Sequence, residues 1–83
     1  MIKVLFFGRL GDIAGAEERK VSVPEQVRTV DDLRQLLGED GEALAKALNE
    51  PQVMVAVNQD LVEWDHVFED EDEVAFLPPV TGG

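Results

Sequence analysis

The residues that could carry chemistry stand together at the end of the printed sequence. Its last six residues, PPVTGG at 78–83, follow an apolar segment and finish on Gly82 and Gly83. A free carboxylate is a poor electrophile because its leaving group would be oxide. Conversion to an acyl-adenylate supplies a good leaving group, and a thiol, a persulfide or an amine can then displace AMP. We therefore expect the carboxylate of Gly83 to be the reactive group, presented to an adenylating enzyme.

The composition of this six-residue segment suits threading into a channel. Pro78 and Pro79 stiffen the exit from the preceding strand and cannot continue ladder pairing. Six extended residues span roughly 20 Å, which is enough to reach an active site inside another protein. Val80, Thr81 and Gly82 follow, and glycine without a Cβ gives the narrowest possible backbone. A chain would end in Gly-Gly by chance about once in 200. The dipeptide is therefore evidence for a reactive terminus only in combination with the stiff exit and the compact domain before it.

The remaining side chains offer little chemistry. His66 is the one histidine, so no histidine pair can bind zinc, and Ser22, the one serine, lacks a nucleophile elbow. Cysteine is absent, which excludes a side-chain thiol. The glycines at 8, 11 and 15 do not match the spacing of a phosphate-binding loop, and the acidic run at 69–73 lacks the glycine and spaced oxygen ligands of a calcium loop. No bound cofactor and no bound metal are therefore expected.

Length and charge narrow the class of partner. Eighty-three residues suffice for one domain. The 18 acidic residues outnumber the 7 basic ones, for a formal charge of -11, which disfavours nucleic acid and anionic membranes and favours a protein with a basic docking face. The same acids also serve solubility. No segment approaches the roughly 20 apolar residues of a membrane span, and the N-terminal run is unlike a secretory leader, so we expect a soluble cytoplasmic protein.

Hydrophobic periodicity predicts the elements that would position the terminus. Alternation predicts a strand over 2–8, with Ile2, Val4 and Phe6 on one face. A capped helix is predicted to begin after Thr29 and to end at Gly38. The other predicted segments are a helical turn within 11–18, a short strand over 20–24, a second helix over 42–49 with Ala43, Leu44, Ala47 and Leu48 inward, and strands over 53–57, 61–64 and 73–77. Strands before and after a central helix predict an α+β domain.

The outer strands also predict an apolar surface. If the face with Phe6 packs on the helix, then Leu5, Phe7 and Leu77 point to solvent on the open face of the sheet, and Leu61 is a further candidate. A soluble monomer rarely leaves such a patch unused. The alternative is that these residues are scattered, or that the 11–18 segment covers them.

Three stretches resemble a known family. IKVLFFG at 2–8, AVNQ at 56–59 and EVAFLPPVTGG at 73–83 are similar to the small subunits of molybdopterin synthase, the MoaD-type sulfur carriers. The likeness covers both ends, whereas 11–50 matches mainly by pattern. It implies a ubiquitin-like β-grasp fold, in which the first and last strands are parallel and adjacent and one main helix packs across a mixed sheet. It also implies a β-grasp domain at 1–77 and a flexible tail at 78–83.

The resemblance implies a sulfur-transfer cycle centred on Gly83. A MoeB-type adenylating enzyme activates its carboxylate with ATP, and sulfur is installed as a thiocarboxylate, giving a C-terminal 1-thioglycine. The tail then enters the active site of a MoaE-type large subunit and gives sulfur to cyclic pyranopterin monophosphate, which builds the dithiolene of molybdopterin. Phe7, Leu61 and Leu77 correspond to the family's docking surface, and the implied assembly is a heterotetramer. The chain itself would be a non-catalytic subunit and co-substrate of a transferase.

Departures from the family pattern leave alternatives open. Asp70-Glu71 stands where the family often has Asp-Gly before the last strand, and Leu77 stands where an aromatic is common, so turn geometry and docking strength are undecided. Similar chains carry sulfur for thiazole synthesis (ThiS-like) or for tRNA thiolation. Others are ubiquitin-like protein modifiers, in which a lysine captures the acyl-adenylate. A plain interaction domain with incidental glycines is the third interpretation.

Overall fold

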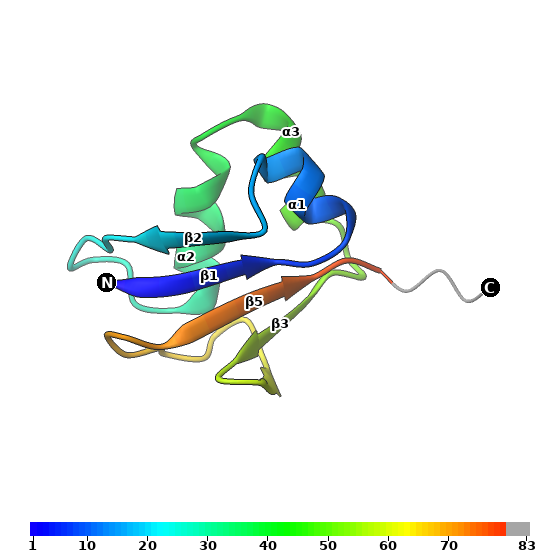
Figure 1. The fold of residues 1–83 in the computed structure, drawn as a ribbon. Coiled ribbons are helices and arrows are strands. Elements are labelled where there is room, and N and C mark those ends of the chain that lie inside the picture. Colours follow the sequence, from blue (N-terminus) through cyan, green and yellow to red (C-terminus); the bar gives the residue numbers. More distant parts are fainter. Residues whose placement is uncertain (80–83) are drawn as a thin grey trace.

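The computed structural model describes residues 1–79, in which one sheet packs against helices (Figure 1). In chain order the elements are β1 Ile2–Phe6, α1 Arg9–Ala14, β2 Glu18–Val21, α2 Val30–Gly38, α3 Glu42–Leu48, β3 Met54–Val57, β4 Asp60–Val62 and β5 Glu73–Leu77. The five strands lie in the order β2-β1-β5-β3-β4. In Figure 1, α2 runs behind the sheet and across its strands. Within these described residues, no helix is long and apolar enough to cross a membrane.

The sheet is mixed because β1 and β5 run parallel, whereas every other neighbouring pair is antiparallel. Val4 stands opposite Val74, and Phe6 opposite Phe76. The pairing continues beyond β1, since the amide of Phe7 donates to the carbonyl of Phe76 at 3.1 Å. This confirms the predicted adjacency of the first and last strands. Because β5 is the central strand, the chain leaves from the middle of one end of the sheet (Figure 1).

One face of the sheet forms the hydrophobic core. Ile2, Val4 and Phe6 are buried, as the alternation in this segment predicts, and Val74 and Phe76 are buried beside them. The rings of Phe6 and Phe76 stack with their centroids 6.0 Å apart. Full burial of a side chain of this kind stabilises the fold by roughly 1.5–3 kcal/mol. A one-residue slip of either strand would expose these side chains to water, so the core determines the phase of both strands.

Helix α2 begins at the predicted N-cap. The hydroxyl of Thr29 accepts a hydrogen bond from the amide of Asp32 at 3.0 Å. In return the carboxylate of Asp32 accepts from the amides of Thr29 and Arg28, each at 3.1 Å. This reciprocal capping box satisfies amides that have no partner within the helix. The start of α2 is therefore encoded in a few neighbouring residues.

The Asp32 carboxylate should make the stability of the domain depend on acid pH. Hydrogen bonds from the backbone amides of Thr29 and Arg28 hold the pKa of Asp32 below its ordinary value of 3.8. A depressed folded-state pKa adds stability above the unfolded-state value, and this stability is lost as the pH falls through the folded-state pKa. We expect Asp32→Asn to be less stable than the wild type near neutral pH, and the two to converge as the pH falls below the folded-state pKa of Asp32. Thermal unfolding across this range measures the gap, and a gap independent of pH would contradict the expectation.

The end of α2 differs from the prediction. Gly38 is the last residue of the helix rather than its cap, and Glu39 takes the cap position with a φ of -68°. A Cβ at position 38 would lie 2.9 Å from the Cβ of Ala45, so glycine at this position allows α2 and α3 to approach closely. The prediction that Ala43 points inward is also wrong, because it is exposed while α3 buries the opposite side of the helix.

The segment between β1 and α2 is displaced from its predicted boundaries. Helix α1 begins at Arg9 rather than within 11–18, because Leu10 is buried and anchors the first turn. Strand β2 covers Glu18–Val21 rather than 20–24 and pairs antiparallel with β1. Its charged sequence is tolerated because β2 is an edge strand, where charge also discourages pairing with another sheet.

Strand β4 is shorter than predicted, ending before Trp64. It covers Asp60–Val62 rather than 61–64. The Trp64 ring lies over the core instead, where it stacks on Phe76 with centroids 6.2 Å apart. The guanidinium carbon of Arg34 lies over the Trp64 ring, 3.9 Å from its centre. Cation–π attraction and burial together favour this position over continued strand pairing.

The β3–β4 hairpin turns on Asn58 and Gln59, which have positive φ values of 50° and 74°. Two such residues match the type I′ turn that suits two-residue hairpins. The Asn58 side chain donates to Asp72 at 3.0 Å and accepts from the amide of Glu73 at 3.0 Å. Its backbone amide donates to the carbonyl of Glu73 at 2.8 Å. The AVNQ stretch therefore fastens this hairpin to the start of β5.

The turn before β5 adopts a left-handed conformation without a glycine. Glu71 has a φ of 71°, which residues with a side chain rarely adopt. Its amide donates to the carbonyl of Met1 at 2.9 Å, and the ammonium of Met1 pairs with Asp70 at 2.5 Å. These bonds to the N-terminus hold Glu71 in place. The Asp70-Glu71 sequence therefore forms the turn at the cost of backbone strain.

Glu71→Gly should stabilise the domain. Glycine removes the left-handed penalty of about 1–2 kcal/mol, while its greater freedom in the unfolded chain offsets about 0.4–1 kcal/mol. We expect a net gain of about 0.5–1 kcal/mol in the free energy of unfolding, measured with urea. Glu69→Gly is the matched control, because Glu69 does not have a positive φ and should lose stability on the same change. Equal losses in both variants would show that Glu71 is not strained.

Candidate functional site

The three residues predicted to dock a partner lie on one face of the sheet. Phe7 follows β1, Leu61 lies in β4 and Leu77 ends β5, and all three line one shallow hollow of about 440 Å³. Phe7 is 47% exposed and Leu61 is 60% exposed. Neighbouring apolar side chains with this exposure are typical of interaction surfaces. The structure therefore brings these residues together, and their docking role stays a prediction.

The hollow forms because small residues occupy the middle of the sheet. A row of register partners crosses β1, β5, β3 and β4: Leu5, Ala75, Ala56 and Leu61. The two alanines are each only 7% exposed and make a floor between larger side chains. Side chains on one face of neighbouring strands stand close together, so a large residue in the middle would fill the hollow. The row can instead receive an apolar side chain from a partner.

Met54 belongs to the same surface, although the sequence analysis missed it. Its side chain is 48% exposed, and it stands opposite Leu77 in the β3–β5 register. The uniformly apolar sequence VMVAV at 53–57 is typical of a strand buried on both faces. Successive side chains in a strand point to opposite faces, however, so the sequence could have shown that Met54 and Val55 point in opposite directions. We define the open-face patch as the following residues: Leu5, Phe7, Met54, Ala56, Leu61, Ala75 and Leu77.

The C-terminal segment leaves the sheet beside the open-face patch. Pro78 follows Leu77 directly and lies against Gly8, where a Cβ would come 3.0 Å from the Pro78 Cγ. Gly8 has a φ of 56°, a left-handed conformation that glycine adopts without strain. Pro78 and Pro79 are both half-buried, so the exit begins packed on the domain. The other predicted site residues lie outside the described residues: Val80, Thr81, Gly82 and Gly83.

The acidic turn at 69–73 lies away from this exit. The acidic turn precedes β5, whereas the exit follows it, so the two lie at opposite ends of that strand (Figure 1). In the turn, the hydrogen-bonded pair of Met1 and Asp70 holds the pKa of the Met1 amine above its ordinary value and the pKa of the Asp70 carboxyl below it. Glu73 and Gln59 border the hollow at its far side. The part of the hollow next to the exit, at Phe7 and Leu77, is therefore apolar.

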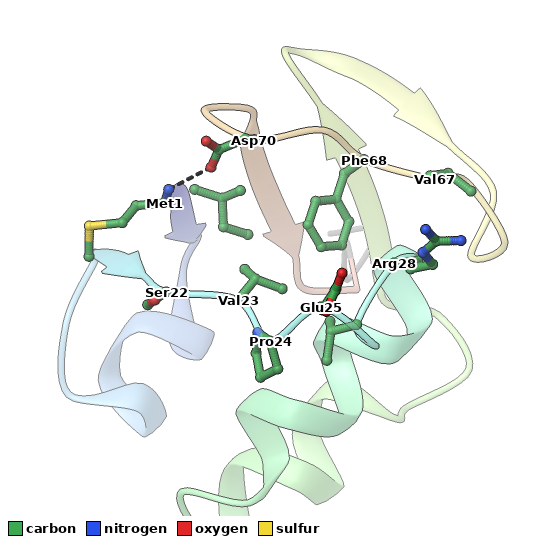
Figure 2. Close-up of a pocket in the computed structure, with 11 residues that line it drawn as sticks. Met1, Ser22, Val23, Pro24, Glu25, Arg28, Val67, Phe68 and Asp70 are labelled. Atoms are coloured by element: carbon green, nitrogen blue, oxygen red, sulfur yellow. Dashed lines mark hydrogen bonds and ion pairs between the residues drawn. The ribbon is translucent and has the colours of Figure 1, made fainter.

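A second hollow, of about 520 Å³, is shown in Figure 2. It lies at the N-terminal end of β1, which is opposite the exit in Figure 1. Figure 2 shows the Phe68 ring pointing into it and the ion pair between Met1 and Asp70 at its rim. Phe68 is 9% exposed and belongs to the core cluster. None of the predicted site residues within 1–79 lines this hollow. Across residues 1–79, no three acidic, histidine or cysteine side chains are grouped so as to hold a metal ion.

The sheet order, the parallel first and last strands and the crossing helix define a ubiquitin-like β-grasp domain. Its candidate site is an apolar sheet face beside the exit of the C-terminal segment. The chain belongs to the ThiS family, whose model matches residues 4–83. Both the fold and the family expected from the sequence resemblance are thereby confirmed.

Known proteins of this kind are similar over their whole length. The chain is 45% identical over 83 residues to the molybdopterin synthase sulfur carrier subunit of Escherichia coli (strain K12), and the match covers 100% of both chains. The crystal structure of SAMP1 from Haloferax volcanii matches with a TM-score of 0.81 and 25% identity, over 99% of this chain and 98% of that one. In the complex of subunits 1 and 2 of molybdopterin-converting factor from Helicobacter pylori 26695, the matching chain has a TM-score of 0.68 and 26% identity, over 99% and 97%.

Proposed function

We propose that this chain is the sulfur carrier subunit of a molybdopterin synthase and acts in the cytoplasm. The observation that carries the proposal is the 45% identity to the Escherichia coli sulfur carrier subunit over the whole of both chains. The position of the open-face patch supports it, because a partner that receives the C-terminal segment would also cover the adjoining patch. In this role the chain supplies a reactive terminus and a docking surface, and the large subunit supplies the catalytic side chains.

Gly83 is the proposed sulfur carrier. Its carboxylate attacks the α-phosphate of ATP on a MoeB-type adenylating enzyme, which releases pyrophosphate and leaves a glycyl adenylate. Hydrosulfide then attacks the acyl carbon: the C–S bond forms, the C–O bond to AMP breaks, and a thiocarboxylate and AMP result. Both species are covalent states of the terminus, so the chain needs no bound cofactor. The apolar surface at the exit favours this step, since a partner that covers it excludes water from a hydrolysable acyl group.

Delivery of the sulfur depends on the reach of the last residues. Four residues follow Pro79, and an extended segment of that length spans roughly 13 Å. The patch can therefore contact the surface of a MoaE-type large subunit while Gly83 reaches its active site and gives sulfur to cyclic pyranopterin monophosphate. The Helicobacter pylori complex of subunits 1 and 2 supports such a pair. A dithiolene holds two sulfur atoms, and each Gly83 thiocarboxylate supplies one. Two sulfur carrier subunits are therefore needed for each dithiolene, which favours a heterotetramer of two carrier and two large subunits.

The experiment that tests the proposal follows the chemical state of the terminus. The full chain is incubated with the adenylating enzyme, ATP and a sulfur donor, and its C-terminal peptide is analysed by mass spectrometry. We expect one oxygen to be replaced by sulfur, and a chain lacking Gly83 is the control. Peptide mapping is needed because methionine oxidation adds nearly the same mass. Absence of the sulfur-bearing peptide would refute the proposal. So would failure of the chain that carries the thiocarboxylate to yield molybdopterin with the large subunit.

A second candidate function is protein modification. The similarity to SAMP1, one of the small archaeal modifier proteins, is the observation that favours it. The same glycyl adenylate would then be captured by a lysine amine of another protein, forming an isopeptide bond. Branched peptides carrying the C-terminal glycines, recovered from digested cell protein, would support this function. Sulfur transfer to thiazole or tRNA precursors would instead show as product formation without the large synthase subunit.

A further inference from the structure

We propose that Met54 is a redox-sensitive contact of the open-face patch, and that oxidation of its thioether to the sulfoxide blocks docking on the large synthase subunit. The inference rests on the proposed function and concerns its regulation. Met54 lies in β3, its side chain is 48% exposed, and it stands opposite Leu77, the last residue before the exit. A partner that receives the C-terminal segment would therefore contact the side chains of Met54 and Leu77.

The direction of the Met54 side chain is fixed by its neighbours in the strand. Val53 and Val55 are 3% and 1% exposed and pack inward, so Met54 between them points away from the core. Met54 and Leu61, both members of the patch, also line a hollow of about 510 Å³. Because this position lies outside the core, a chemical change there alters the surface and leaves the packing of the domain intact.

The composition of the chain directs oxidants toward methionine. In the chain that ends in a free carboxylate, neither a cysteine thiol nor a thiocarboxylate competes for the oxidant, and the two methionines are Met1 and Met54. A hydroperoxide transfers one oxygen atom to the sulfur: the O–O bond breaks, the S=O bond forms, and water or an alcohol leaves. The sulfur loses two electrons and the peroxide gains them. A sulfoxide reductase reverses the change.

The sulfoxide converts an apolar contact into a polar one. Burial of a polar group without a hydrogen-bond partner is unfavourable, and we expect it to weaken docking by at least about tenfold. Met1 provides an internal comparison, because it is 56% exposed and lies at the opposite end of the domain, beside Asp70. Similar exposure should give both sulfurs similar reactivity in the free chain, and only one of them belongs to the patch.

The first test compares the wild type with Met54→Leu, a variant that keeps the apolar volume and retains Met1. Each full chain is treated with hydrogen peroxide, and its affinity for the purified large subunit is measured by calorimetry before and after. We expect the wild type to lose at least about tenfold and Met54→Leu to lose nothing. Equal losses in both chains, or none in the wild type, would overturn the inference. Thermal unfolding of the oxidised wild type should be unchanged, and a marked loss of stability would also overturn it.

The second test uses protection from oxidation. In the complex with the large subunit, Met54 should oxidise several-fold more slowly than in the free chain, whereas Met1 should oxidise at the same rate in both. Unprotected Met54 in a formed complex would place it outside the contact and refute the inference. If the untreated chain does not bind the large subunit at all, the proposed function itself fails, and this inference fails with it. Restored affinity after treatment with a sulfoxide reductase completes the positive result.

Discussion

A chain extended by one alanine beyond Gly83 is expected to support no molybdopterin synthesis. The added residue moves the terminal carboxylate by one residue length, about 3.3–3.6 Å. It also replaces the reactive glycine carboxylate with an ordinary amide, which neither attacks ATP nor carries sulfur. The loss should be complete, because the new alanine carboxylate lies one residue beyond the position at which Gly83 is activated and brings a Cβ into the narrow end of the segment. The measurement is molybdopterin formation in a host that lacks its own carrier subunit.

The control for this loss is restoration of the original terminus. An extension that a protease removes after Gly83 should recover full activity, which shows that the chain itself was intact. Unfolding of the extended chain should match the wild type, because the core consists of residues before the exit. Synthesis at the wild-type rate, with mass spectrometry showing the alanine still attached, would eliminate the terminal carboxylate as the reagent.

Leu77→Asp should weaken docking on the large subunit by on the order of 100-fold or more, because an unpaired carboxylate would be buried in the interface. Leu77 lines the hollow of the open-face patch and is only half-buried in the free domain. Its neighbour Phe76 points the other way and fills the core. The variant should therefore fold, with at most about 1 kcal/mol lost from reduced strand propensity. Affinity for the purified large subunit is the measurement.

Val67→Asp is the matched control for Leu77→Asp. Val67 is an apolar residue that is 61% exposed, but it lies outside the open-face patch and lines the second hollow at the far end of the domain. The same change in charge should leave docking within about twofold of the wild type, since a surface substitution away from the interface costs little. Equal losses in the two variants would indicate a general charge effect. Unfolding of Leu77→Asp alone would refute the assignment of Leu77 to the open face.

Local patterns in the sequence were sufficient to predict several features of the fold and of the candidate site. The alternation in β1 and β5 predicted which residues enter the core, because side-chain direction in a strand has period two. Thr29 predicted the start of α2, because a cap satisfies amides within its own turn. The terminal glycines and the two prolines indicated the chemistry of the terminus without reference to any fold. The resemblance to a family, rather than the periodicity, supplied the parallel pairing of the first and last strands.

Tertiary contacts decided the features that local patterns could not. Gly38 ends α2 where α3 comes so close that a Cβ would not fit, and Leu10 sets the start of α1 through burial in the core. Glu71 keeps its left-handed conformation through bonds to Met1, at the other end of the sequence. The hollow of the open-face patch requires Ala56 and Ala75 to be register partners.

The sequence by itself therefore determined the phase of the strands, the start of the main helix and the candidate reactive group. The strand phase can be predicted from the two-residue period of apolar side chains, the helix start from a cap within one turn, and the reactive group from the terminal carboxylate itself. The tertiary structure alone decided the shape of the open-face patch, the pairing of Met54 with Leu77 within it and the position of the exit beside it. These depend on the register between strands distant in sequence, which local propensity does not specify.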